Sequence, residues 1–411
     1  MKTELINQIK TDIHGQIEEA YRLSNNEIME MVDELVRLNG QEYALSIDDK
    51  IQISKDIYNE LRGMAILQPL LDDQAVTEIM VNGFDAIYVE QSGQLIKTNL
   101  SFETKEKLED MIQKIVSGIN RLVNEASPIC DARLEDGSRV NVVLPPIALN
   151  GPILTIRKFA KGMITMADLV SWGSATSEMA AFLKSVVEAK YNIFICGGTG
   201  SGKTTLLNIL SNYILAHERI ITIEDSAELQ LKKVDHIVRL EARNHNMEGI
   251  GAITIRDLIK TSLRMRPDRI IVGEVRGHEA IDMLQAMNTG HDGSLSTGHA
   301  NSVKDMIARL ETMVLLHEDM PMKAVRNQIA SAIDLFIFVG RTKNYERKIL
   351  QISEVISITE EAIELNPIYE YRHDMNQLTE HDLTEDRSAG FLQVGQLQHT
   401  EKLILWGSER G

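Results

Sequence analysis

The chain has 411 residues, of which 25% are charged and 43% hydrophobic, a composition typical of a folded protein with two or three domains. Its 43 basic and 60 acidic residues give a net charge of −17, which argues against broad non-specific DNA binding but not against a local basic groove. The two cysteines, Cys130 and Cys196, cannot build a disulfide framework or a four-thiolate zinc site, and this favours a reducing compartment.

The first part of the chain, residues 1–67, is predicted to be helical. Apolar residues from Ile28 to Leu38 recur at helical spacing and stop before Gly40. A second amphipathic stretch runs from about Ile53 to Leu67. This segment contains no motif typical of a catalytic or ligand-binding site, so we interpret it as a packing or docking module.

Residues 68–160 predict a smaller α/β domain without a nucleotide signature. An amphipathic helix is expected at Lys105–Val123. The expected strands are Val76–Val81, Ala86–Val89, Val140–Val143 and Ile153–Ile156. The next residues, 161–177, contain glycines, small residues and a helix start at Met166–Asp168, and we interpret them as an interdomain linker.

Residues 178–411 predict a second domain in which short apolar strands alternate with helices, a pattern that favours a parallel α/β sheet. The expected strands are Asn192–Cys196, Ile220–Ile223, His236–Leu240, Ile270–Val272 and Leu335–Val339. The last part of the chain holds two strand-like runs, Ile349–Ile358 and Ala362–Tyr371, and a polar tail.

The sequence predicts neither a signal peptide nor a membrane-spanning helix. Residues 1–10 contain no apolar core of the kind that signal peptides have. The longest uncharged run, Val140–Ile156, is interrupted by prolines and falls short of the ~18 residues that suggest a spanning helix. Any membrane association is therefore expected to be peripheral.

The strongest motif follows the predicted strand that ends at Cys196, and it matches the Walker A pattern without a gap. Its residues are Gly197, Gly198, Thr199, Gly200, Ser201, Gly202, Lys203, Thr204 and Thr205. The glycines let backbone N–H groups close around phosphate oxygens, and the helix that follows adds positive potential at its N-terminus. Lys203 can bridge the β- and γ-phosphates, and the Thr204 hydroxyl can ligate Mg²⁺. The spacing is not that of a dinucleotide-binding loop.

Two of the predicted strands end in carboxylates, Glu224 with Asp225 and Glu274. Parallel strands open on the same edge of a sheet, so these acids are expected beside the Walker A loop. One carboxylate can orient or deprotonate the attacking water, and another can hold Mg²⁺ through water. We interpret Glu224 as the base and Glu274 as the metal-side acid, with the reverse assignment open. The alternative is that these acids only cap helix N-termini.

A polar, glycine-punctuated loop between Asn288 and Ser302 surrounds a short strand-like run, Ser294–Thr297, and contains His291 and His299. Two histidines in this place could sense the γ-phosphate or transmit its loss, although spacing alone favours a structural role. No group of histidines and cysteines has metal-ligand spacing, so the sequence predicts no zinc site.

Taken together, these blocks resemble the secretion ATPase superfamily of type II and type IV systems. The Walker A motif, acidic box, Walker B motif and histidine box match in order at Gly197–Thr205, Ile221–Leu229, Ile270–Gly277 and Thr297–Ala300. The runs Ile255–Gly277 and Asp282–Ser294 look specifically like the CpaF type, the motors of tight-adherence (Flp) pilus assembly, and the helical N-terminus fits that branch. The resemblance covers roughly residues 69–340.

The resemblance implies an α/β fold, with a RecA-like P-loop core and a parallel-rich sheet in residues 178–411. A smaller PAS-like α/β domain and a helical segment precede this core. ATP and Mg²⁺ are implied as cofactors, with Thr204 and Glu274 on the metal side. A homohexamer is also implied, with ATP between the two domains of its subunits.

Arginines of the N-terminal domain complete the nucleotide site in this superfamily. The segments around Arg139 and Arg157 resemble its two arginine-finger segments, and Arg133 is a third, weaker match. The histidine-box role falls to His299, which is preceded here by glycine instead of the usual leucine. Two cysteines cannot form the four-cysteine zinc module of many pilus-extension and type II secretion ATPases, which disfavours those branches.

We therefore expect a cytoplasmic hexameric motor ATPase at the cytoplasmic face of the cell membrane. It would hydrolyse ATP to drive Flp-type pilus assembly or secretion through an inner-membrane platform protein. A type IV secretion traffic ATPase, which uses the same engine, and a nucleotide-binding scaffold with negligible hydrolysis are the alternatives. The net charge counts against a DNA translocase, and no stable nucleic-acid partner is expected.

Overall fold

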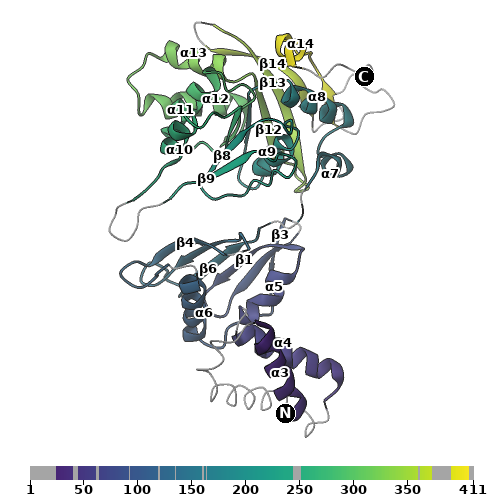
Figure 1. The fold of residues 1–411 in the computed structure, drawn as a ribbon, viewed down its shortest axis with the longest axis vertical. Helices are drawn as coiled ribbons and strands as arrows, with labels where there is room; N and C mark the ends of the chain where they lie inside the picture. Colours follow the sequence, from purple (N-terminus) through teal and green to yellow (C-terminus); the bar gives the residue numbers. More distant parts are fainter. Residues whose placement is uncertain are drawn as a thin grey trace. The chain divides into compact units, whose positions relative to one another are not determined.

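The computed structural model divides into two units, residues 1–161 and 162–411 (Figure 1). It describes residues 25–39, 45–61, 64–91, 93–118, 121–134, 136–159, 162, 164–243, 251–359, 362–372 and 390–406. Each unit has its own sheet and its own buried apolar clusters. Gly40, where the first expected helix stops, and Ile119 and Asn120 of the helix expected at Lys105–Val123 lie outside the described residues.

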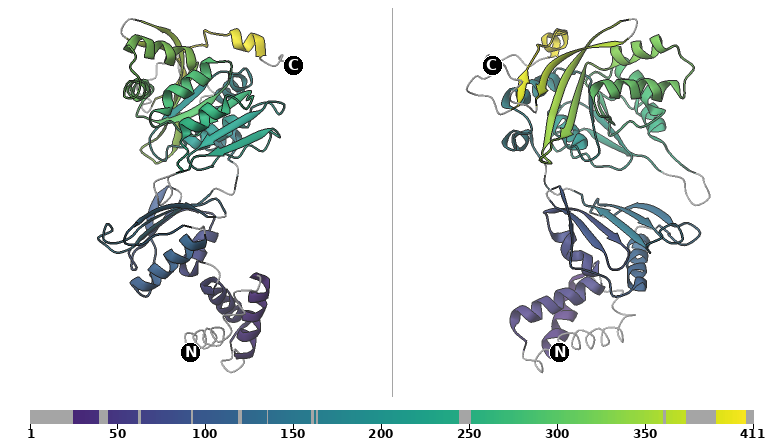
Figure 2. Two further views of the ribbon diagram at one scale, coloured as in Figure 1. Left: turned by 60° about the vertical axis from the view of Figure 1, so that its left-hand side comes forward. Right: turned by 180° about the vertical axis from the view of Figure 1, so that it is seen from behind.

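The described part of the first unit begins with two helices, α3 (Asn25–Asn39) and α4 (Ile47–Leu61). They pack on each other around a small apolar cluster of Ile28, Val32, Val36, Ile53 and Ile57 (Figure 2). Helix α4 begins earlier than its apolar spacing predicts because the Ser46 hydroxyl accepts the Asp49 N–H and caps a polar first turn. The stretch expected to continue this helix to Leu67 ends instead in a separate 3-10 turn, η1 (Ala65–Leu67).

The rest of the first unit is an antiparallel sheet of six strands in the order β3-β2-β1-β6-β5-β4. Helix α6 (Lys105–Gly118) covers one face, and its buried side chains share a cluster with strand residues such as Val140 and Leu154. A short helix, α5 (Gln68–Asp72), precedes the sheet. The strands are β1 (Val76–Asn82), β2 (Ile87–Gln91), β3 (Gln94–Lys97), β4 (Ile129–Arg133), β5 (Arg139–Val143) and β6 (Ile153–Arg157).

The second unit is built on nine strands in the order β15-β14-β13-β12-β7-β11-β10-β8-β9. The strands from β12 to β9 run parallel, as the sequence predicts. The C-terminal strands β13, β14 and β15 extend the same sheet antiparallel. The strands are β7 (Ile193–Gly197), β8 (Ile220–Glu224), β9 (Ile237–Glu241), β10 (Arg269–Val272), β11 (Leu295–His299), β12 (Leu335–Arg341), β13 (Arg347–Ile358), β14 (Ile363–Tyr371) and β15 (Phe391–Gln393).

Helices cover both faces of this second sheet (Figures 1 and 2). One apolar cluster joins the strands to α7 (Met166–Ser171), α8 (Ser177–Glu188) and α9 (Lys203–Ser211). The other joins them to α10 (Ile255–Ser262), α11 (Glu279–Asn288), α12 (Val303–Leu315) and α13 (Met322–Ala332). Residues along β7 alternate between the two clusters, with Ile193 and Ile195 in one and Phe194 and Cys196 in the other.

Most of the segment expected to be a linker, residues 161–177, belongs to the second unit. Helix α7 begins at a capping box, in which the Thr165 hydroxyl accepts the Asp168 N–H and the Asp168 side chain accepts the Thr165 N–H. Met166 and Ala175 are buried in the cluster under α8. The helix start expected at Met166–Asp168 is confirmed, but a six-residue helix is too short to show the amphipathic period that would assign it to a folded unit.

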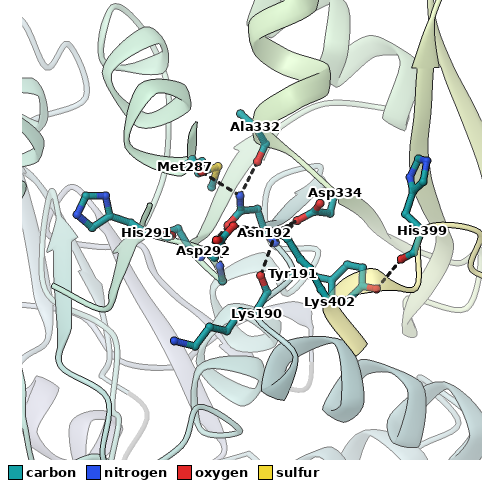
Figure 3. Close-up of polar contacts among 12 residues, drawn as sticks. Lys190, Tyr191, Asn192, Met287, His291, Asp292, Ala332, Asp334, His399 and Lys402 are labelled. Atoms are coloured by element: carbon teal, nitrogen blue, oxygen red, sulfur yellow. Dashed lines mark hydrogen bonds and ion pairs between the residues drawn. The ribbon is translucent and has the colours of Figure 1, made fainter. Parts of the chain in front are cut away.

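The C-terminal segment is tied to the start of β7, the strand that leads into the Walker A loop (Figure 3). Lys402 of α14 (Glu401–Trp406) donates to the carboxylates of Asp292 and Asp334 at 2.9 and 2.8 Å. The Tyr191 hydroxyl donates to the His399 carbonyl. The buried Asn192 amide donates to two carbonyls and accepts two backbone N–H groups, so its hydrogen-bonding capacity is filled.

Candidate nucleotide-binding site

The Walker A loop joins β7 to α9, with the strand before it and the helix after it that the sequence predicts. Gly200 and Gly202 have φ values of +66° and +99°, the left-handed region that glycine enters without strain. A side chain at Gly197 would lie 2.2 Å from the Val339 carbonyl oxygen, because β12 pairs closely with β7 at this point. The loop therefore needs glycine at three of its positions.

Lys203 begins α9 and folds back over the loop. Its ammonium group is buried and donates to the Gly198 carbonyl at 3.0 Å. The Ser201 hydroxyl donates to the same carbonyl at 2.8 Å. Thr204 and Thr205 follow in the first helical turn and are half-buried, while Thr199 at the tip of the loop is exposed.

The two predicted acids lie on neighbouring parallel strands at the sheet edge that carries the loop. Glu224 is the last residue of β8, and Glu274 follows β10 by two residues. Glu224 is buried, and its Oε2 accepts the N–H groups of Glu228 and Leu229 at 2.7 and 3.1 Å. This carboxylate therefore also fixes the loop that follows its own strand.

The Glu274 carboxylate contacts two side chains, those of His299 and Arg276. Its Oε1 lies 2.8 Å from His299 Nε2, and its Oε2 lies 2.9 Å from a guanidinium nitrogen of Arg276. Arg276 also reaches Asp225 at 2.9 Å. A continuous polar chain thus runs from the end of β11 through Glu274 to the residue after β8.

His299 closes this chain onto the Walker A lysine. It ends β11, directly beside Gly197 in the parallel register, and its Nδ1 lies 3.2 Å from Lys203 Nζ. An ammonium group can only donate, so Nδ1 accepts and the ring proton is on Nε2, facing Glu274. Burial lowers the pKa of His299; Glu274 opposes that shift, while the charges of Lys203, Arg276 and Arg309 add to it. A neutral imidazole therefore lies between the loop lysine and the strand-end acid.

The lowered pKa of His299 predicts how stability depends on pH. Between its folded-state pKa and the unfolded value of 6.5, the unfolded chain binds more protons than the folded chain. Stability is therefore expected to fall as pH drops through this window and to level off below it. Thermal unfolding from about pH 5 to about pH 8 should show a smaller slope for His299→Gln than for the wild type. An equal slope in both proteins would contradict this expectation.

His291, the other histidine of the polar loop, lies at the opposite end of β11. The His291 Nδ1 lies 3.2 Å from the Ala286 carbonyl, and the Ser294 hydroxyl donates to the His291 carbonyl at 2.7 Å. These contacts anchor the turn before the strand. Spacing alone favours a structural role for a histidine of this loop, and the contacts of His291 fit such a role.

The predicted arginine fingers lie in the first unit, on neighbouring antiparallel strands. Arg133, Arg139 and Arg157 are directly opposite one another across β4, β5 and β6. They therefore share the face of the sheet that points away from the α6 cluster, which holds Val140 and Ile156. Arg157 pairs with Glu78 on β1 at 3.6 Å. Sequence spacing could not reveal this row, because it depends on the register of three strands.

Oxygen donors suited to Mg²⁺ are present at the loop. Among the residues that the structure describes, no cluster of three or more His, Cys, Asp or Glu side chains could hold a metal by itself. Mg²⁺ needs no such cluster, because it is usually bound by one or two protein oxygens together with substrate phosphates and water. The Thr204 hydroxyl and the Glu274 carboxylate fit that pattern.

Residues 60–394 match the family described as "Type II/IV secretion system protein". The chain belongs to this family. The resemblance to the type II and type IV secretion superfamily is thereby confirmed, and so is the predicted α/β class.

Two relatives in the type II/IV secretion system protein family cover most of the chain. The conjugal transfer protein TrbB of Rhizobium radiobacter is 34% identical over 292 residues, which make up 70% of this chain and 85% of TrbB. The type IV secretion system protein PtlH of Bordetella pertussis is 32% identical over 299 residues, 67% of this chain and 88% of PtlH.

A solved structure supports the fold. The Yersinia pseudotuberculosis ATPase DotB aligns with a TM-score of 0.53 and 16% identity over 74% of this chain and 80% of DotB. At this identity the likeness shows a common fold, and the chemistry of the site is argued from its own residues.

Proposed function

We propose that this protein is a motor ATPase of a type IV-like secretion machine, which hydrolyses ATP in the second unit. The observation that carries the proposal is the convergence of the Walker A loop, Glu224 and Glu274 on one edge of a parallel sheet, with Lys203 and Glu274 joined through His299. A loop alone supports nucleotide binding. Strand-end carboxylates beside it add the means to orient and deprotonate water.

Each residue of the site has a proposed role in binding or in hydrolysis. Backbone N–H groups of the loop and Lys203 would bind the phosphate chain, and Thr204 and Glu274 would hold Mg²⁺. When bound, Mg²⁺ neutralises charge on the phosphate oxygens. Glu224 would orient the attacking water and accept its proton, and His299, between Lys203 and Glu274, would sense the γ-phosphate or transmit its loss.

We also propose that Arg139 and Arg157 complete the site as arginine fingers in a homohexamer, with Arg133 as a third candidate. The three arginines lie opposite one another on one face of the sheet, with Glu78 beside Arg157, and such a row of cations can attract an anion. Phosphoryl transfer gains several orders of magnitude when a cation neutralises charge developing on the γ-phosphate. Supplying that cation from the first unit would make hydrolysis depend on domain position, as a motor requires.

The nucleotide proposal predicts that Lys203→Ala weakens ATP binding by about 10²-fold or more, because it removes the charge that holds the β- and γ-phosphates. Calorimetric titration with ATP and Mg²⁺ measures the loss. Lys233→Ala removes an exposed charge in the same unit and serves as the matched control. Unchanged affinity in Lys203→Ala would exclude the proposed function.

The arginine-finger proposal predicts that Arg139→Ala leaves ATP binding nearly intact and lowers kcat by about 10²-fold or more. Mixing this variant with Lys203→Ala subunits gives a further check, because a finger acting between subunits restores some activity in mixed assemblies. A parallel loss of ATP binding and thermal stability would instead mark Arg139 as a structural residue of the sheet.

The names of the relatives favour type IV secretion or conjugal transfer as the system that this motor serves. Tight-adherence pilus assembly is the second candidate, favoured by the Ile255–Gly277 and Asp282–Ser294 runs and by the paired N-terminal helices. In either system we propose an inner-membrane platform protein as partner and the cytoplasmic face of the membrane as the place of action. No helix within the described ranges has the length and apolar character needed to span a bilayer.

Deleting the gene separates these two systems. Loss of surface pili with transfer intact would favour pilus assembly, and loss of substrate transfer with pili intact would favour secretion. A nucleotide-binding scaffold is the remaining candidate, and it predicts tight ATP binding with no phosphate release even when the platform protein is present.

A further inference from the structure

Two arginines face each other across the hairpin that joins β12 to β13. Arg341 and Arg347 are directly opposite in the antiparallel register. The turn between them is closed by hydrogen bonds from Thr342 N–H to the Glu346 carbonyl and from Tyr345 N–H to the Thr342 carbonyl. Like charges in this position repel each other and weaken the strand pair. A local rule broken at one place in a sheet is a reason to look for a compensating function there.

Both arginines converge on the Walker A loop. The Nε–H groups of Arg341 and Arg347 each donate to the Gly200 carbonyl at 3.0 Å. A side chain at Gly200 would lie 2.6 Å from a terminal nitrogen of Arg341, so glycine at this position also makes room for the guanidinium. Hydrogen bonds from charged donors are stronger than neutral ones, and here two of them act on one carbonyl.

The orientation of this carbonyl determines where the next N–H group points. In a trans peptide the carbonyl and the N–H point in opposite directions. With the Gly200 carbonyl held by the arginines, the Ser201 N–H points back into the loop and donates to the Gly198 carbonyl at 3.3 Å, a long hydrogen bond that a bound phosphate oxygen can replace. That carbonyl also accepts from Lys203, so the Ser201 N–H and the lysine face the same space. A carbonyl polarised by cations also makes the N–H of its own peptide a better donor.

We propose that Arg341 and Arg347 are positioning residues that hold the Gly200–Ser201 peptide with its N–H toward the nucleotide phosphates. The inference rests on the proposed function and deepens it, because it assigns a role in nucleotide affinity to the hairpin that joins β12 to β13. The two arginines and the loop belong to the same unit. Their effect is therefore independent of subunit assembly, unlike that of Arg139 and Arg157.

The test compares nucleotide affinity with turnover in the full-length protein. Arg341→Ala and Arg347→Ala are each expected to raise the Kd for Mg²⁺-ADP by about tenfold, equivalent to about 1.4 kcal/mol, and to raise KM for ATP in parallel. The value of kcat is expected to stay within about threefold of the wild type, because the arginines act before the chemical step. The double lysine variant, Arg341→Lys with Arg347→Lys, should recover part of the affinity, since lysine keeps the charge and one donor.

The matched control is Lys343→Ala, which removes an exposed charge from the same turn. It is expected to change the Kd by less than about twofold, as usual for an exposed charge. An equal loss in Lys343→Ala would show that only the general charge of the hairpin matters and would overturn the proposal. Wild-type affinity in the Arg341→Ala, Arg347→Ala double variant would overturn it as well. The affinity of Lys203→Ala for the nucleotide is measured in the same experiment. Unchanged binding in that variant would exclude the proposed function itself, which separates its failure from failure of the arginine proposal.

Discussion

Glu274→Gln is expected to lower kcat for ATP hydrolysis by about 10²–10³-fold while leaving ADP binding nearly unchanged. Glutamine keeps the shape of the side chain but removes the charge that pairs with Arg276 at 2.9 Å and faces His299 at 2.8 Å. Without that charge the site holds Mg²⁺ less tightly, so the Mg²⁺ concentration for half-maximal activity should rise. Steady-state hydrolysis at several Mg²⁺ concentrations measures both effects. Wild-type kcat in this variant would contradict the motor proposal.

Glu224→Gln separates the two acid roles. If Glu224 is the base, kcat falls by about 10²–10⁴-fold while the Mg²⁺ requirement stays as in the wild type. If the roles are reversed, the shift in Mg²⁺ requirement appears in Glu224→Gln and not in Glu274→Gln. Glu241→Gln is the matched control, because Glu241 ends the neighbouring strand β9 directly opposite Glu224. Its loss is expected to change neither quantity.

The sequence predicts the nucleotide loop and its strands well because their signals are local. The glycines and Lys203 of the Walker A loop lie within one short motif, and strands β7, β10 and β12 each contain a continuous apolar run. Parallel strands buried on both faces have this pattern. Once the strands are assigned, the parallel arrangement itself places Glu224 and Glu274 at the same edge.

Contacts that depend on strand order and register could not be predicted from the sequence. The His299 contacts with Lys203 and Glu274 require β11 to lie between β7 and β10, an order that no spacing along the chain reveals. The same holds for Arg341 and Arg347. They reach the Gly200 carbonyl because β12 continues past Gly197 and β13 returns beside β12. Side-chain chemistry between distant segments appears only after strand order is known.

Short elements are hard to assign for a different reason. Strand β4 has a single buried residue, Cys130, among exposed and half-buried ones, and its pairing with β5 decides its structure. The start of helix α7 is visible in the sequence, but its place in the second unit depends on the burial of Met166 under α8. In such segments tertiary contacts outweigh intrinsic propensity.

The largest effect on stability is expected at a buried charged pair that no pattern along the chain indicates. Arg269 begins the apolar strand β10 yet is completely buried, and its guanidinium binds Glu218 through two hydrogen bonds of 2.8 and 2.7 Å. It also donates to the Val187 carbonyl at 2.7 Å, and Lys190 lies 3.4 Å from Glu218. Burial alone would raise the pKa of Glu218, but Arg269 and Lys190 bring it below its ordinary value. The pair therefore contributes stability that is lost when acid protonates the carboxylate.

Arg269→Met is expected to lower the free energy of unfolding by about 3–5 kcal/mol, because it leaves the Glu218 carboxylate buried without its main partner. For a unit of this size each kcal/mol corresponds to roughly 2–4 °C in Tm. Calorimetry of the full chain measures the shift in the transition that ADP stabilises, since only the nucleotide-binding unit responds to the ligand. Adding Glu218→Gln to Arg269→Met should restore more than half of the loss, because it removes the uncompensated charge. If the double variant were no more stable than Arg269→Met, the cost would lie in lost packing around the arginine and not in the orphaned carboxylate.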